Sequence, residues 1–216
     1  MASFTVFNCK RGFFILKGEK NVKLLEDRIR EDGLVLPGNV LKVNQFLNHQ
    51  IDPDLMYKLG QEFVSLFEGE KITKILTIEA SGIAPAMMTG LILHVPVLFA
   101  RKQKSVTMND GLFTAEVYSY TKKVKNTVSV DQKFLSSDDK VLIIDDFLAN
   151  GQAVQGLIEI CKEAQAELVG VGIAIEKSFQ DGAALIEKQG IKLESLARIS
   201  SFDDNKVHFV GDETNE

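Results

Sequence analysis

The segment of this sequence that is best suited to chemistry is residues 141–153, VLIIDDFLANGQA. An apolar run is followed by two adjacent acids, Asp145 and Asp146, and then by a short loop that ends at Gly151 where a helix begins. A helix start offers unpaired N–H groups and a positive dipole end to a phosphate. Adjacent carboxylates need hydroxyl groups, cations or water as partners. The pattern suits a sugar phosphate, although an ordinary strand-to-helix turn with a capping Asp and a surface acid explains the spacing equally well.

Another small-residue turn, EASGIAP (79–85), follows the apolar run 72–78. Ser81 and Gly82 can present backbone N–H groups there, since the turn opens a helix. An ordinary turn is the alternative.

Basic residues follow two more apolar runs. Lys177 comes after 168–175 and either donates to a ligand carbonyl or extends to solvent. Phe179 either stacks on an aromatic base or belongs to the core. Arg101, Lys102 and Lys104 follow 95–100 and either contact a polyanion or form a solvated basic loop.

The elements that must position these residues alternate between apolar strands and amphipathic helices. This order predicts an α/β fold with a mostly parallel sheet covered by helices on both faces. Ligands bind such a sheet beyond the carboxyl ends of its strands. The expected strands are 72–78, 95–100, 141–144, 168–175, 193–199 and 206–210, and the expected helices are 22–32, 53–67, 84–92, 152–164 and 181–189.

Two segments show no sustained periodicity of apolar residues. Residues 34–51 read as an irregular, partly apolar segment that could form a small hood over the sheet together with the C-terminal strands. Residues 101–126 are polar and Lys-rich, with an extended piece at 113–120. Because they lack a core pattern of their own, we expect either a mobile functional loop or a protruding hairpin.

Composition excludes several classes of protein. The chain has 216 residues, enough for one α/β domain, and its net charge of −5 argues against a broad nucleic-acid surface. The two cysteines, Cys9 and Cys161, form no disulfide framework, so we expect a reducing, cytoplasmic location with Cys161 in the core. No apolar run approaches the ~18–20 residues of a membrane span. Residues 1–21 are expected to be a disordered or artefactual extension, and 22–216 a single domain.

The same segments resemble a known family. VLIIDDFLANGQA resembles the phosphoribosyl-pyrophosphate signature of type I phosphoribosyltransferases, and EASGIAP resembles their pyrophosphate loop. LKVNQFLNHQID (41–52), TIEASGIAPAMMTG, VLIIDDFLANGQ and IEKSFQ are similar to bacterial members that use xanthine. The resemblance runs from about Val22 to the C-terminus. It implies a homodimer that converts xanthine and 5-phosphoribosyl 1-pyrophosphate to xanthosine 5′-monophosphate and pyrophosphate, with no nucleic acid or membrane partner.

The resemblance also implies a role for each group of residues. Asp145 and Asp146 would hold the ribose hydroxyls, and Ala149, Asn150, Gly151, Gln152 and Ala153 would cradle the 5′-phosphate. Glu79, Ala80, Ser81 and Gly82 would meet the pyrophosphate, with Mg²⁺ bridging its oxygens and no direct protein ligand implied for the metal. Lys102 and the segment 103–120 would close over the site. Leu41, Asn48, Lys177 and Phe179 would contact the purine. Asn150-Gly151 replaces the family's more usual Thr-Gly, and Asn can also donate to a phosphate.

Three alternatives stay open. A hypoxanthine/guanine or adenine phosphoribosyltransferase would share these motifs, although a 6-amino group cannot accept from Lys177. A transcription regulator that senses phosphoribosyl pyrophosphate without catalysis would need a DNA-binding module, and residues 1–52 of this acidic chain leave little room for one. An inactive α/β domain is the third alternative.

Overall fold

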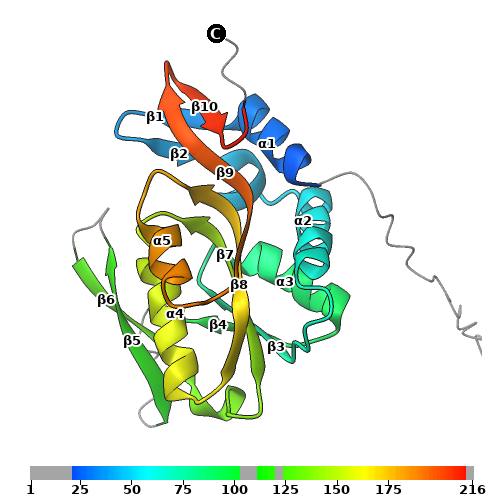
Figure 1. The fold of residues 1–216 in the computed structure, drawn as a ribbon, viewed down its shortest axis with the longest axis vertical. Helices are drawn as coiled ribbons and strands as arrows, with labels where there is room; N and C mark the ends of the chain where they lie inside the picture. The colour runs from blue at the N-terminus through cyan, green and yellow to red at the C-terminus, as the bar shows by residue number, and fades with distance from the viewer. Residues whose placement is uncertain (1–20, 103–110, 120–123, 213–216) are drawn as a thin grey trace, which may run out of the picture.

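The computed structural model describes residues 21–102, 111–119 and 124–212, and its centre is a six-stranded sheet (Figure 1). The strand order is β10-β9-β8-β7-β3-β4, and every neighbouring pair except β10–β9 is parallel. The strands are β3 (Lys74–Ile78), β4 (Val97–Ala100), β7 (Lys140–Leu148), β8 (Glu167–Lys177), β9 (Leu193–Asp203) and β10 (Lys206–Phe209). The predicted mostly parallel sheet is confirmed.

Helices cover both faces of the sheet, as predicted. One buried cluster lies under α1 (Asn21–Asp32), α2 (Pro53–Leu66) and α3 (Ile83–Leu93), and the other lies under α4 (Gln152–Glu163) and α5 (Gly182–Glu187). Asp52 caps α2, since its Oδ1 accepts from the backbone N–H of Leu55 at 3.1 Å. No helix in these described ranges is long and apolar enough to cross a membrane.

The segment 34–51 is more regular than its sequence suggests. It holds the antiparallel pair β1 (Leu34–Leu36) and β2 (Val40–Lys42), followed by a π-helix, η1 (Asn44–Asn48). Three-residue strands are too short to produce a readable period, which explains why the sequence indicated only an irregular segment. Figure 1 shows this segment beside α1, β9 and β10, above the end of the parallel sheet. We call residues 34–48 the hood.

The segment 101–126 contributes to a hairpin, one of the two forms expected. Its strands β5 (Leu112–Ser119) and β6 (Val124–Asp131) pair antiparallel from Leu112↔Asp131 to Ser119↔Val124, and η2 (Gln132–Phe134) follows. The sequence pattern did not predict β6. The hairpin packs on the rest of the molecule, because Ala115 and Val117 are buried in the α4 cluster together with Val128 and Val130 of β6. Backbone bonds between Arg101 and Ser129 (2.9 and 3.0 Å) join the hairpin to the end of β4.

Several expectations about single elements need correction. The continuous apolar run 95–100 predicts a buried strand, but β4 lies at the sheet edge and leaves Phe99 43% exposed. The spacing of Leu24, Leu25 and Ile29 predicts that all three share the apolar face of α1, but Leu24 is 37% exposed, whereas Leu25 and Ile29 are buried. Cys161 is buried in α4, as expected. Cys9, Lys104, residues 1–20 of the expected extension and much of 103–120 lie outside the described ranges.

Candidate active site

The acidic pair lies inside a strand. β7 continues to Leu148 because Phe147 and Leu148 still pair with Ile175 and Glu176 of β8, so the expected end at residue 144 was too early. Asp145 is only 3% exposed. Burial, reinforced by the neighbouring Asp146 carboxyl, raises the pKa of Asp145 well above its usual range, and burial also raises the pKa of Asp146. The free pair therefore retains protons more readily than exposed acids and ionises best when cationic or hydrogen-bonding partners arrive.

Gly82 brings the turn 79–82 directly against this pair. A Cβ atom at Gly82 would lie 2.5 Å from both Asp145 Oδ1 and Thr77 Oγ1, which is closer than such atoms can approach. The Thr77 hydroxyl is fully buried, and it has no hydrogen-bond partner within the described part of the chain. Sequence reasoning missed Thr77, because a threonine inside an apolar strand is ordinary. The two strand ends thus form one site around a close backbone approach.

Glu79 connects this turn to the end of β4. Its backbone N–H donates to Ala100 O at 3.1 Å, and its Oε1 accepts from the backbone N–H of Lys102 at 2.6 Å. The peptide bond between Glu79 and Ala80 is cis. These contacts locate Lys102 beside the turn, although its side chain is exposed.

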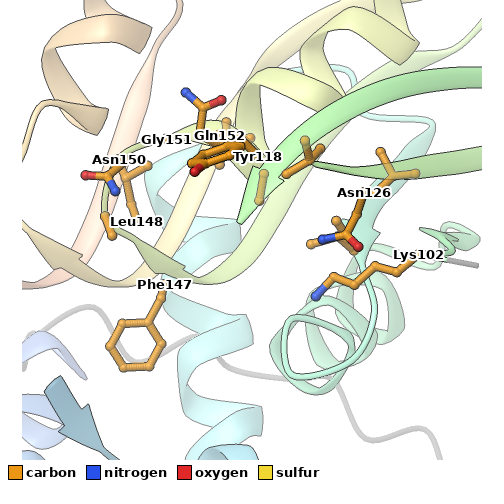
Figure 2. A pocket seen from close by; sticks show the side chains of 14 residues that line it. Lys102, Tyr118, Asn126, Phe147, Leu148, Asn150, Gly151 and Gln152 are labelled. Atoms are coloured by element: carbon orange, nitrogen blue, oxygen red, sulfur yellow. The ribbon is translucent and has the colours of Figure 1, made fainter. Parts of the chain in front are cut away.

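A pocket of about 300 Å³ lies at the start of α4 (Figure 2). Gly151 precedes the first helical residue, Gln152, and has a φ of +78°, a conformation that favours glycine. The unpaired N–H groups of the first helical turn are available to an anion here. The lining residues include all five of the predicted phosphate loop: Ala149, Asn150, Gly151, Gln152 and Ala153.

Residues of the hairpin and of β7 complete this pocket, and Tyr118 among them falls within the segment 103–120 that is predicted to cover the site. Tyr118 and Asn126 come from the hairpin, Phe147 comes from β7, and the predicted Lys102 also lines it. Figure 2 shows the Lys102 and Asn126 side chains extending into the space beside β7. The sequence contained no signal for Asn126, because its position depends on the register of the hairpin. The expected cover over the site therefore includes the packed hairpin, which contributes the polar side chains of Tyr118 and Asn126 to the pocket.

Lys177, the last residue of β8, reaches the hood. Its Nζ donates to the backbone oxygen of Asn39 at 2.8 Å and lies 5.9 Å from the centroid of the Phe202 ring. Phe179 packs edge-on against Phe202, with centroids 5.7 Å apart, and is 40% exposed. Burial lowers the pKa of Lys177. Of the two alternatives for Lys177, a side chain that extends freely to solvent does not match this geometry.

The remaining predicted residues belong to the hood. Leu41 in β2 is buried, with 7% exposure, whereas Asn48 at the end of η1 is exposed. Leu41, Asn48, Lys177 and Phe179 are absent from the lining of the pocket at α4. The structure therefore divides the predicted site residues into a group around the acidic pair and the α4 loop and a second group at the hood.

An acidic pair with Asp145 buried and Asp146 half-buried lies beside a helix-start loop at the end of a parallel sheet with a hood, an arrangement that suits an enzyme acting on a sugar phosphate. The chain belongs to the phosphoribosyltransferase family, because residues 47–210 match the family model described as "Phosphoribosyl transferase domain". It is 71% identical over 192 residues to a protein of Ligilactobacillus salivarius named "Xanthine phosphoribosyltransferase", covering 89% of this chain and all of that protein. A protein of the same name from Lactiplantibacillus plantarum is 63% identical, covering 88% of this chain and 97% of that one.

Solved structures confirm the fold. The adenine phosphoribosyl transferase of Trypanosoma brucei has a TM-score of 0.70 at 18% identity, covering 89% of this chain and 85% of that one. The corresponding enzyme of Giardia lamblia has a TM-score of 0.68 at 18% identity, covering 82% of this chain and 98% of that one. At such identities the likeness concerns the fold alone.

Proposed function

We propose that this chain transfers the 5-phosphoribosyl group from 5-phosphoribosyl 1-pyrophosphate to xanthine, giving xanthosine 5′-monophosphate and pyrophosphate, as in purine salvage. The observation that carries the proposal is the 71% identity to a protein named for this reaction, over 89% of the chain. The contact of the turn 79–82 with Asp145 and the pocket at Gly151 support it, because together they offer partners for pyrophosphate, ribose hydroxyls and phosphate.

The phosphoribosyl end would be held by β7 and the α4 loop. Asp145 and Asp146 would accept hydrogen bonds from the ribose 2′- and 3′-hydroxyls, and residues 149–153 would donate backbone N–H groups to the 5′-phosphate. As the bond to pyrophosphate breaks, the anomeric carbon gains positive charge. Two carboxylates held nearby stabilise that charge more strongly in a dry site than in water.

The pyrophosphate end would lie at Glu79, Ala80, Ser81 and Gly82, with Mg²⁺ on the pyrophosphate oxygens. Oxygen atoms suit this hard cation, and those nearby belong to Glu79, Asp145 and Thr77, whose hydroxyl has no hydrogen-bond partner among the described residues. When bound, Mg²⁺ would neutralise charge on the leaving pyrophosphate. Lys102, whose backbone N–H already bonds Glu79, would add a cation at the same end.

The purine would bind between β8 and the hood. Lys177 now donates to Asn39 O, and a purine carbonyl could take the place of that acceptor without a large movement of the side chain. Xanthine carries two carbonyl groups and is comparatively acidic, so an ammonium group suits it. Leu41 would supply an apolar contact, Asn48 a polar one, and Phe179 an aromatic face.

A competition of the four bases tests this proposal. Purified chain with 5-phosphoribosyl 1-pyrophosphate and Mg²⁺ would be given xanthine, hypoxanthine, guanine and adenine, and product formation would be followed by chromatography. We expect the highest kcat/KM for xanthine. Guanine or hypoxanthine as best substrate would move the assignment to the first alternative, and adenine would refute the role of Lys177. No turnover together with a salt-sensitive shift of operator DNA would favour the regulator.

Three further statements stay predictions. They are a single domain over 22–216, a homodimeric assembly and a cytoplasmic location. Sedimentation velocity at several protein concentrations tests the assembly, and a monomer at all of them would contradict it.

A further inference from the structure

The loop that precedes α4 is packed against the backbone of a segment farther along the chain. Gly182, the first residue of α5, donates its N–H to Ala149 O at 3.0 Å. Seen from the other side, a Cβ atom at Gly151 would lie 3.1 Å from Gly182 Cα. The two glycines therefore meet backbone to backbone, with no side chain between them.

This contact leaves no room for a larger residue at 182. A Cβ atom there would lie 2.3 Å from Ala149 O and 2.9 Å from Gly151 N. Both atoms belong to the backbone, so a side chain could be accommodated only by displacing the loop itself or the start of α5. Gly151 also lines the pocket at α4. A change at Gly182 that displaces the loop would shift the backbone donors that the proposed function assigns to the phosphate.

The segment that carries Gly182 is itself firmly held. The backbone N–H of Ser178 donates to Ile199 O at 2.9 Å, and the Ser178 hydroxyl donates to Glu176. Glu176 is 2% exposed and also accepts from the Ser195 hydroxyl and from Arg198 Nε at 3.3 Å. A buried carboxylate with three donors fixes its surroundings strongly. Glu176 therefore anchors the turn between β8 and α5, and this turn holds the loop.

We propose that Gly182 is a positioning residue for the phosphate-binding loop and that Glu176 anchors it there. The inference rests on the proposed function, because it takes residues 149–153 as the site of the 5′-phosphate. Displacing aligned donors by a fraction of an ångström weakens binding of the group they contact. Binding of the phosphoribosyl substrate should weaken, whereas binding of the purine at the hood should stay the same.

The test is Gly182→Ala in the full chain, with Ala184→Ser as matched control. Each variant adds one heavy atom to α5, but residue 184 is exposed. We expect Gly182→Ala to raise KM for 5-phosphoribosyl 1-pyrophosphate by roughly tenfold or more and to change KM for xanthine by less than about twofold. Its Kd for ribose 5-phosphate, measured by calorimetry, should rise in parallel, and the control should match the wild type.

An unchanged KM for 5-phosphoribosyl 1-pyrophosphate in folded Gly182→Ala would overturn the inference, as would an equal rise of both KM values. If that variant does not fold, Glu176→Gln provides the test of the inference. It removes the ion pair with Arg198 without adding volume, and a selective rise of the same KM supports the inference whereas no change refutes it. Failure of the proposed function would look different, because the wild-type chain would then show no turnover with any purine.

Discussion

Replacing Asp145 by asparagine removes the charge of one buried carboxyl while keeping its shape. Asp145 is 3% exposed, and its Oδ1 accepts from the backbone N–H of Asp146 at 3.0 Å, a bond that an asparagine oxygen can also make. The variant therefore separates charge from packing. We expect opposite effects on activity and on stability.

Activity should fall because, in the proposed function, the carboxylate would stabilise the carbon that becomes positive. Loss of one preorganised group of this kind typically costs about 10²–10³ in kcat, or about 2.7–4 kcal/mol. Stability should rise. Burial holds the pKa of Asp145 above its unfolded value, so the folded wild type binds more protons than the unfolded chain. Wild-type stability is therefore lost as pH rises from about 4 through the folded pKa. Asparagine has no such dependence.

The assay is thermal unfolding of both proteins between pH 4 and pH 8, together with steady-state turnover. The difference in Tm, variant minus wild type, should be smallest near pH 4 and grow as pH rises. Each kcal/mol appears as about 2–4 °C in a chain of this size. Asp138→Asn, at an exposed position, is the control and should change neither quantity. A variant with full turnover, or one that is less stable than wild type at pH 7, would refute the reasoning.

Other predictions concern separate parts of the molecule. Lys177→Met should raise KM for xanthine by about 10- to 100-fold, because a hydrogen bond from a charged group contributes about 1.5–3 kcal/mol. The KM for 5-phosphoribosyl 1-pyrophosphate should stay nearly unchanged. Equal changes in both KM values would contradict the role of Lys177. Burial tends to raise the pKa of Asp139, but hydrogen bonds from Lys74 Nζ (2.8 Å), Ser136 and Thr73 outweigh it and hold the pKa below the usual range. Asp139→Asn should lower the free energy of unfolding at neutral pH by about 1–3 kcal/mol, a loss that shrinks in acid as the wild-type carboxyl is protonated; urea titration at two pH values checks it. Burial raises the pKa of the Cys161 thiol to about 12, so iodoacetamide should label Cys161 only in urea, and native labelling seen by peptide mass spectrometry would contradict its burial.

Elements with a strong local pattern were predicted closely. The helix expected at 53–67 is α2 (Pro53–Leu66), since Asp52 and Pro53 mark its start and apolar residues repeat along one face. The strand expected at 168–175 lies within β8, because a run buried on both faces is continuously apolar. These signals arise from residues a few positions apart.

Elements defined by distant partners were predicted less well. β6 has no alternation strong enough to be read alone, and Val128 and Val130 are buried because the hairpin packs on α4. The end of β7 was misplaced because Asp145 and Asp146 look like loop residues, although pairing with β8 keeps the strand extended. The three-residue strands of the hood could not be recognised in the sequence, because they are too short to show an alternating pattern.

The candidate chemical groups can be recognised in the sequence, because an acidic pair, a helix-start loop with Gly151 and a lysine after an apolar strand are local arrangements. What each of these groups touches depends on the tertiary fold. Asp145 lies against Gly82 beside the Thr77 hydroxyl, Gly151 meets Gly182, and Lys177 reaches Asn39, 138 residues away in the chain. Such contacts depend on strand order and on the close approach of backbones, and no spacing between neighbouring residues encodes them.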